Sequence, residues 1–370
     1  MRKGLSLALV LSCAASPASA QPSVREKIAG YFQGWYAHIP GSEILVQPTR
    51  EVVLPGLECY RVERQSSSKT HQEINLALYD AARGEVFVGD VFHDPGRSRA
   101  NRPLDDGRDR PNIEASLREL FGLPVSVALS PAPRGALTPL TVSIREDKDG
   151  NAFATVAGFV SNDGSTVMLG EFHSLAESPA AFREKLLGQR PGVATEHGRF
   201  TVTEFLDFQC ERCRVRTPDV RRAVEAKGGA VEVRFLPLTK SHDWAFAAAE
   251  CAAALAGVNP ALYRRYEETV FARAEGMSAT AARELAADIA EAAGARAAFQ
   301  AELSSGRARG RVLGDIGLGV RLGIHGPPAF VLDGRLVPGE RGFLENALLL
   351  FRGEPSAPAP TAVPRGSGGP

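Results

Sequence analysis

The N-terminal part of the chain carries one helical pattern followed by several strand-like ones. Ser23 and Glu26 form a capping box, and apolar side chains then recur at the spacing of one helix face: Ile28, Tyr31, Phe32, Trp35 and Tyr36. Short β-favouring stretches follow at residues 43–46, 51–53, 57–62, 74–79 and 85–92, with a turn at 80–84. Residues 22–95 therefore predict a helix packed on an antiparallel sheet.

The same order of patterns then recurs. Asn112 is placed to cap a second amphipathic helix, and strand-like stretches follow at 125–129, 140–144 and 153–160. The best-matching segments are Val86-Phe87-Val88-Gly89-Asp90 and Val167-Met168-Leu169-Gly170-Glu171, closely followed by Phe92-His93 and Phe172-His173. We predict that residues 22–95 and 111–175 are two copies of one α+β module, joined by an exposed linker at 94–110. Two unrelated β-rich stretches are the alternative.

The second half of the chain follows a different pattern. Ser178 and Pro179 predict a short helix that ends at Gly188, so residues 176–199 are expected to form a linker helix and a loop with a flexible joint. From residue 200 strands alternate with helices, and a hairpin at 329–336 and a helix at 343–351 come last. This order predicts an α/β domain over residues 200–353. Residues 354–370 are mostly Pro, Ala, Gly and Ser, and we expect them to be disordered.

The N-terminus has the three parts of a cleavable secretory signal. Arg2 and Lys3 precede the apolar run 5–11, and Ala18-Ser19-Ala20 supplies the small residues of a cleavage site. We therefore expect residues 1–20 to be removed and the protein to be exported to the periplasm, with lipoprotein processing at Cys13 as the alternative. No other stretch approaches the roughly 20 apolar residues of a membrane-spanning helix.

Charge and cysteine content narrow the possible functions. The 43 basic and 43 acidic residues cancel, and no long run of one sign occurs, so we expect no nucleic-acid partner. Of the five cysteines, Cys13 lies in the predicted signal. The other four suggest disulfide chemistry in an oxidising compartment, although a chain of 370 residues does not need disulfides to fold.

Two of these cysteines stand where thiol chemistry is favoured. An apolar strand ends in Asp207-Phe208-Gln209 and delivers Cys210 and Cys213 to the start of a helix. Backbone N–H groups at a helix N-terminus stabilise an anion, so Cys210 is expected to be the nucleophile. Three residues later, Cys213 lies on the same face and can resolve a mixed disulfide. Half of a zinc site and an inert structural disulfide are the alternatives, and no second CxxC or HxxxH supports the first. We expect no metal or cofactor.

The surrounding residues agree with redox chemistry, because Glu204 precedes Cys210 on the strand, Pro218 lies in the helix and Gly326-Pro327-Pro328-Ala329-Phe330 opens the hairpin. On these residues, 200–351 resembles the thioredoxin fold of the DsbA-like bacterial thiol:disulfide oxidoreductases.

The resemblance implies that Glu204 relays protons to and from Cys213. It also implies that Pro328 is a cis-proline facing the cysteines, that Pro327 and Ala329 help to bind the substrate chain, and that residues 242–323 are a helical insertion. The sequence departs from this family at Glu211 and Arg212, between the cysteines, where many members have Pro and an aromatic residue or His. We expect these two charges to tune the thiolate in opposite directions. Pro327 also replaces the commoner Thr or Val.

The N-terminal modules look similar to the N-terminal domain of the DsbC and DsbG isomerases, which in those proteins dimerises and carries the catalytic domain on a linker helix. Two copies in one chain depart from that pattern. Our hypothesis is that the duplicated module replaces the dimer platform and that the protein is a monomer.

Several remaining residues invite a functional interpretation that the sequence alone does not support. Cys251 lies at helical spacing with apolar residues and is expected to be a core residue, and a disulfide from Cys59 to Cys251 would have to join two domains. His93 and His173 recur in the two modules, where shared packing or a shared surface is favoured over a metal site. His242 starts the insertion, and the sequence does not decide whether it caps the helix or points toward the active face.

The sequence therefore predicts an exported thiol:disulfide oxidoreductase acting on protein substrates, with an isomerase or reductase bias suggested by the N-terminal platform. A membrane-bound or soluble redox partner would reset the cysteine pair. A DsbA-like oxidase is the alternative activity. A non-enzymatic thioredoxin-fold chaperone or binding module with a static disulfide is the alternative of another class.

Overall fold

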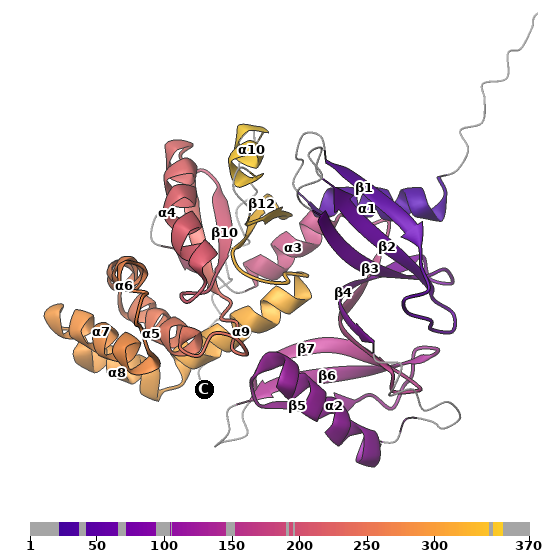
Figure 1. Ribbon diagram of the computed structural model, residues 1–370, viewed down its shortest axis with the longest axis horizontal. Coiled ribbons are helices and arrows are strands. Elements are labelled where there is room, and N and C mark those ends of the chain that lie inside the picture. Colours follow the sequence, from indigo (N-terminus) through magenta and orange to yellow (C-terminus); the bar gives the residue numbers. More distant parts are fainter. Residues whose placement is uncertain are drawn as a thin grey trace, which may run out of the picture.

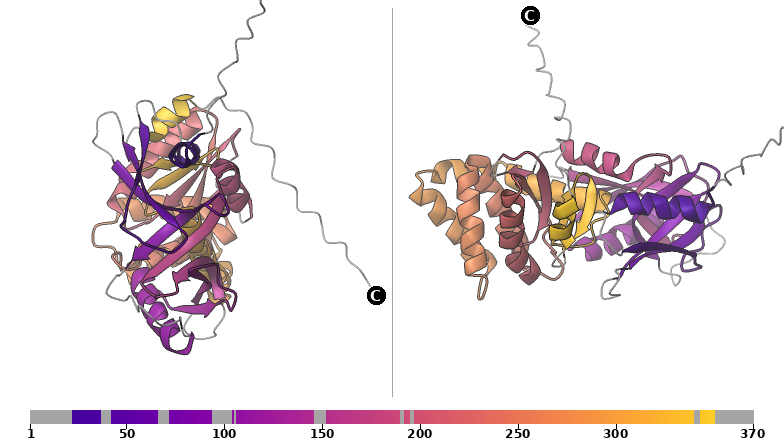
Figure 2. Two further views of the ribbon diagram at one scale, coloured as in Figure 1. Left: turned by 90° about the vertical axis from the view of Figure 1, so that its right-hand side faces the viewer. Right: turned by 90° about the horizontal axis from the view of Figure 1, so that it is seen from above.

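The computed structural model describes residues 22–36, 42–65, 72–93, 104, 106–145, 152–189, 192–194, 197–339 and 343–350. The predicted signal peptide, most of the predicted linker 94–110 and the predicted disordered tail lie outside these residues. Three parts follow one another along the molecule: a helical insertion at one end, a mixed sheet in the middle, and a large antiparallel sheet at the other end (Figures 1 and 2).

The first module forms as its pattern predicts. Helix α1 (Val24–Trp35) starts at the capping box of Ser23 and Glu26 and buries Ile28, Tyr31, Phe32 and Trp35. It is followed by the antiparallel strands β1 (Glu43–Pro48), β2 (Glu58–Gln65), β3 (Gln72–Asp80) and β4 (Glu85–His93). The predicted strand at 51–53 is wrong. Since β1 and β2 pair from Glu43–Gln65 to Pro48–Tyr60, these residues belong to the loop that reverses the chain between the two strands.

The second module repeats this order with α2 (Asp106–Phe121), β5 (Val125–Leu129), β6 (Leu137–Arg145), β7 (Ala152–Ser161) and β8 (Thr166–Ser174). Helix α2 begins before the predicted cap Asn112, within the predicted linker, and takes in Pro111. Asp109 in the first turn favours this earlier start, because an acidic side chain is stabilised near a helix N-terminus, whereas Pro111 removes one backbone N–H from the second turn. The expectation of a repeated helix-plus-antiparallel-sheet unit is confirmed.

The two modules join into one eight-stranded sheet of order β1-β2-β3-β4-β8-β7-β6-β5. The last strands of the modules pair in antiparallel fashion, and the matched glycines Gly89 and Gly170 stand opposite each other at the middle of this pair. A Cβ on Gly89 would lie 2.1 Å from the Leu169 carbonyl oxygen, and one on Gly170 would lie 2.2 Å from that of Val88. Both positions require glycine, because the backbones approach too closely for a side chain.

The C-terminal half contains a second sheet of order β13-β12-β10-β11-β9. Strand β10 (Thr201–Leu206) pairs in parallel with β11 (Ala230–Phe235) through the crossover helix α4 (Glu211–Ala226). The hairpin of β12 (Ala329–Leu332) and β13 (Arg335–Pro338) adds antiparallel strands on one side, and β9 (Val193–Ala194) closes the other. Helix α10 (Phe343–Leu350) follows the hairpin. This order matches the predicted α/β arrangement.

The helical insertion separates β11 from β12. It consists of α5 (Ala245–Val258), α6 (Pro260–Ala272), α7 (Ala279–Ala292), α8 (Arg296–Ser304) and α9 (Arg307–Arg321). The first four gather at one end, and α9 runs from them toward the N-terminal sheet, where it packs against β7 and β8 (Figure 1). Arg321 at its end forms an ion pair with Glu171 of β8, 2.9 Å away. The insertion therefore also connects the two sheets.

Helix α3 (Pro179–Gly188) begins at Ser178 as predicted, but it is not a free-standing connector. Arg183 is fully buried, and its guanidinium lies 3.4 Å from the ring centroid of Trp35. The same group donates to the carbonyl oxygens of Trp35 (2.5 Å) and Gly334 (3.2 Å), in α1 and in the β12–β13 turn. One buried cation on α3 thus contacts both halves of the molecule.

Candidate functional site

The two cysteines lie at the start of α4, where β10 has just ended. Cys210 is the N-cap residue of α4 and Cys213 lies one turn further, fully buried. Both are free thiols. The Cys210 sulfur lies 3.7 Å from the carbonyl oxygen of Pro327, and the Pro327–Pro328 peptide bond is cis, as the resemblance implies. The first turn of α4 and the loop before β12 therefore meet at Cys210.

The two thiols differ strongly in acidity. A hydrogen bond from the Cys213 thiol is the largest of the effects that lower the pKa of Cys210 to about 6, and the backbone N–H groups of Cys213 and Arg212 add to it against the cost of burial. Burial raises the pKa of Cys213 well above its usual value, and its hydrogen bond to Cys210 acts in the same direction. Near neutral pH, Cys210 is a thiolate and Cys213 is a protonated donor.

Glu204 lies in β10, inside the domain and behind the cysteine pair. Burial raises the pKa of this carboxyl group to about 7, although Arg221 and a hydrogen bond from Thr217 lower it. The Thr217 hydroxyl donates to Oε1 at 2.5 Å, while Oε2 has no partner. Because Glu204 also contributes to the raised pKa of Cys213, the two groups are close enough to interact electrically. A carboxyl group that titrates near neutrality is suited to proton exchange with a buried thiol.

A buried ion pair stands behind Glu204. Arg221 of α4 forms a bidentate ion pair with Glu267 of α6. The Tyr263 hydroxyl donates a hydrogen bond to the same carboxylate. Arg221 and Glu267 shift the pKa of Glu204 in opposite directions. Sequence reasoning missed this network, since Arg221 lies more than 40 residues before Tyr263 and Glu267.

The remaining predicted site residues lie in different positions around the cysteines. Glu211 and Arg212 are exposed on the first turn of α4. Arg212 acts on Cys210 through its backbone N–H. Ala329 is the first residue of β12, is buried, and pairs with Phe205. Pro327 and Pro328 are buried beside Cys210.

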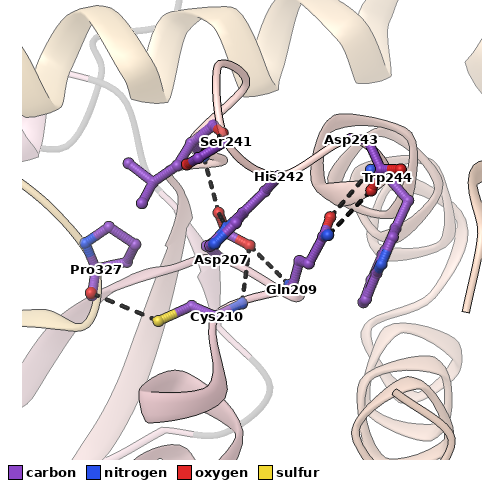
Figure 3. A network of polar contacts seen from close by, with 9 residues as sticks. Asp207, Gln209, Cys210, Ser241, His242, Asp243, Trp244 and Pro327 are labelled. Carbon is purple, nitrogen blue, oxygen red and sulfur yellow. Dashed lines mark hydrogen bonds and ion pairs between the residues drawn. The ribbon is translucent and has the colours of Figure 1, made fainter. Parts of the chain in front are cut away.

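Sequence reasoning missed Asp207, whose carboxylate lies beside the backbone nitrogen of Cys210 (Figure 3). Its Oδ1 accepts the N–H groups of Gln209 (2.7 Å) and Cys210 (3.2 Å). Its Oδ2 accepts the N–H of Leu238 (2.8 Å) and faces Nδ1 of His242 at 2.7 Å. His242 therefore points toward the active face, which answers the question that the sequence left open. The signal for Asp207 was a charged residue at the end of an apolar strand.

A cleft of about 200 Å³ opens beside Cys210. Residues of α4, the start of α5 and the α6–α7 loop line it: Phe208, Gln209, Cys210, Glu211, Arg214, Trp244, Ala274 and Glu275. Trp244 is held in place because its backbone N–H donates to Oε1 of the Gln209 side chain at 3.0 Å. This cleft is large enough for one side chain of a substrate next to its reacting sulfur.

The other two described cysteines have no such surroundings. Cys251 is buried in α5, and burial raises its pKa to about 12. Cys59 lies in β2 within a separate apolar cluster on one face of the N-terminal sheet. Both are free thiols, so the disulfide considered between them is absent.

His93 and His173 do not share surroundings. His173 follows Gly170 by three residues, whereas His93 follows Gly89 by four, and this difference turns the side chains to opposite faces of the sheet. His173 is buried against Tyr31, Trp35 and Phe182, and burial lowers its pKa to about 4. His93 instead contacts Thr166 on the neighbouring strand.

The described residues contain no group of three or more His, Cys, Asp or Glu side chains that could hold a metal ion. Within the same ranges, no helix combines the length and the apolar character needed to cross a membrane.

Comparisons with known proteins bear on the C-terminal half. Residues 201–346 match the family model of the DSBA-like thioredoxin domain. The catalytic domain of Proteus mirabilis ScsC is 18% identical, over 46% of this chain and 96% of that one, with a TM-score of 0.39. A thioredoxin-like oxidoreductase from Silicibacter pomeroyi is 25% identical, over 45% and 95%, with a TM-score of 0.37. A search of curated proteins finds no match.

The family match confirms the predicted DsbA-like thioredoxin fold with its helical insertion, and this fold supports a redox role. The match does not include residues 22–175, so the resemblance of the modules to DsbC and DsbG stays a prediction.

Proposed function

We propose that this chain, whose residues 201–346 form a DSBA-like thioredoxin domain, is an exported thiol:disulfide oxidoreductase that acts on protein substrates through Cys210 and Cys213. One observation carries the proposal. The pKa of the Cys210 thiol is lowered to about 6, whereas burial raises the pKa of the more deeply buried Cys213 thiol. An inert structural cysteine pair does not require this difference, whereas a nucleophile and a resolving thiol do.

The geometry supports a two-step exchange. The Cys210 thiolate attacks a substrate disulfide, forms a mixed disulfide, and releases one substrate sulfur as a thiolate. Cys213 then loses its proton to Glu204 and attacks the Cys210 sulfur, which forms the Cys210–Cys213 disulfide and releases the second substrate thiol. A membrane-bound or soluble redox partner would supply two electrons to return the pair to dithiol. In isomerisation, a second substrate thiolate attacks the mixed disulfide instead, so no net electrons are transferred.

Substrate binding is proposed at the cis-proline loop and the neighbouring cleft. Pro327 presents a carbonyl oxygen 3.7 Å from the Cys210 sulfur, where an extended substrate chain can approach. The cleft beside Trp244 would take a substrate side chain, and its rim carries Glu211, Arg214 and Glu275. We assign Glu211 and Arg212 to the exposed rim, with Arg212 tuning the thiolate through its backbone.

The direction of exchange is proposed to favour isomerisation or reduction, with oxidation as the second candidate. The large N-terminal sheet next to the redox domain supports the first, since it offers a surface for unfolded chains. The lowered pKa of Cys210 favours the second, because stabilising the thiolate stabilises the reduced pair and makes its disulfide more oxidising.

The test compares two substrates at equal enzyme concentration. We expect the protein to restore activity to scrambled ribonuclease faster than it oxidises reduced ribonuclease in a glutathione buffer. Activity on the reduced form alone would establish the oxidase. Cys213→Ala should trap a mixed disulfide with the substrate, and Cys251→Ala serves as the matched control. A protein that forms no mixed disulfide would favour the non-enzymatic chaperone or binding module.

Export and oligomeric state complete the proposal. The periplasm is supported by the secretory pattern of residues 1–20. A monomer is supported by the pairing of β4 with β8, because each module already has the other as its partner along this strand. A dimer that persists on dilution in a sizing experiment would contradict the monomer.

A further inference from the structure

We propose that His242 acts through Asp207 as a proton-dependent positioning residue for Cys210, so that a protonated His242 favours the Cys210 thiolate. The inference rests on the proposed role of Cys210 as the nucleophile. It concerns a second charged pair beside the cysteines, separate from the Glu204 region on the other side of β10.

The Asp207 carboxylate is built into the backbone that presents Cys210. It is 1% exposed and accepts three backbone N–H groups, two from the turn leading into α4 and one from Leu238. One of these N–H groups is that of Cys210 itself, so the carboxylate fixes the N-cap residue in space. Its negative charge also raises the pKa of Cys210. Asp207 therefore positions the nucleophile and, while unneutralised, opposes its ionisation.

His242 supplies the opposing charge. Its Nδ1 lies 2.7 Å from Oδ2 of Asp207, and Figure 3 shows the ring beside this carboxylate and near Cys210. A carboxylate accepts hydrogen bonds, so Nδ1 carries a proton in both states of the ring, and Nε2 gains or loses the second one. The side chain is 22% exposed, which lets solvent exchange this proton.

The segments around His242 carry other charged side chains: Lys240 and Asp243 in its own loop, and Glu211 and Arg214 of α4 at the cleft beside Trp244. Lys240 forms an ion pair with Glu119, and His325 with Asp90. Asp243 accepts a hydrogen bond from the side chain of Gln209. Within the described residues, His242 is the charged side chain that pairs with Asp207.

The predicted consequence is a coupling between two protons. When His242 is protonated, the pair has no net charge, and the Cys210 thiolate forms without repulsion from Asp207. When His242 is neutral, the pair carries one negative charge next to the thiolate. Protonation of His242 therefore offsets part of the loss of thiolate as the pH falls. A purely structural histidine would hold the loop but would not change the titration of Cys210.

The test measures the pH at which Cys210 is half ionised, by pulse alkylation of the reduced full chain and mass spectrometry of the Cys210 peptide. We expect His242→Gln to raise this midpoint by about 0.5–1 pH unit. We expect Asp207→Asn to lower it, and His242→Gln to have little further effect in the Asp207→Asn background. His242→Lys, which keeps a positive charge, should restore a low midpoint. His197→Gln, an exposed histidine elsewhere, is the control.

An unchanged midpoint in His242→Gln would overturn the proposal, and so would an equal increase in the presence and absence of Asp207. If His242→Gln fails to fold, His242→Lys is compared with wild type instead. Because lysine keeps its positive charge at every pH of the assay, the midpoint of Cys210 ionisation in His242→Lys should not lie above that of wild type, and a higher midpoint would overturn the proposal. The measurement needs no substrate. It therefore remains valid even if the ribonuclease assays contradict the proposed function.

Discussion

Replacing Glu204 with glutamine should change the pH dependence of stability in a defined direction. Folding raises the pKa of this carboxyl group from 4.5 to about 7, mainly through burial. Below pH 4.5 the carboxyl is protonated in both states and there is no ionisation penalty. Between these two values the unfolded chain loses the proton while the folded protein keeps it, so stability falls as the pH rises. Above pH 7 the full penalty applies, and about 2.5 pH units correspond to about 3 kcal/mol.

Glutamine has the same shape and cannot ionise. Its carbonyl oxygen can still accept the Thr217 hydroxyl, and its amide nitrogen takes the place of Oε2, which has no partner. Any free-energy cost of burying the amide is the same at every pH. The change between pH 4 and pH 8 in the stability difference from wild type therefore reports only the charge on Glu204. We expect Glu204→Gln to gain about 3 kcal/mol relative to wild type over this interval.

The assay is urea unfolding of both proteins, kept reduced, followed by circular dichroism at several pH values and constant ionic strength. Exposed Glu268 on α6 provides the control, since Glu268→Gln should follow wild type at every pH. A Glu204→Gln difference that is the same at pH 4 and pH 8 would refute the assignment of a buried, protonated carboxyl group. The same variant should slow resolution of the mixed disulfide, because Cys213 would lose its proton acceptor.

Four further substitutions or modifications have expected outcomes. In the wild type, iodoacetamide should alkylate Cys210 with a half-maximal rate at about pH 6 and leave Cys251 unmodified in the native state, as peptide mass spectrometry will detect. Gly89→Ala should cost about 3 kcal/mol or more in urea unfolding, because the new Cβ meets the neighbouring strand at 2.1 Å. Gly30→Ala, in open space on α1, should instead stabilise the protein by roughly 0.5–1 kcal/mol. Arg183→Met should cost about 3 kcal/mol by leaving buried carbonyl groups unpaired, and it should split one unfolding transition into two.

Local patterns predicted much of the fold and the centre of the site. Three features act within a few residues of the chain: the capping box at Ser23, the spacing of Cys210 and Cys213, and the proline before β12. The local structure that each one produces can therefore be predicted from neighbouring positions in the sequence. The match between the segments around Gly89 and Gly170 also pointed to a repeat. It could not show that these glycines would face each other in one sheet, because strand pairing depends on contacts that lie far apart along the chain.

The parts that sequence reasoning missed are pairings across long separations. His242 meets Asp207 only because the parallel crossover from β10 to β11 brings the following loop back to the start of α4. Arg183 is buried because α1 and the β12–β13 turn, both far from it in sequence, converge on its guanidinium. A charged residue that ends an apolar strand, such as Asp207, signals an unusual partner but does not identify it.

The loops on either side of Cys210 each rest on a different N-terminal module. The Thr239 hydroxyl, in the loop that leads to His242, donates to the carbonyl oxygen of Phe121 at the end of α2. His325, just before the cis-proline, lies 2.8 Å from Asp90 of β4. The N-terminal sheet therefore does more than provide a surface at a distance from the chemistry. Each of the two loops beside Cys210 is held by a different module. The arrangement of the two modules in the sheet therefore determines where these loops lie relative to the nucleophile.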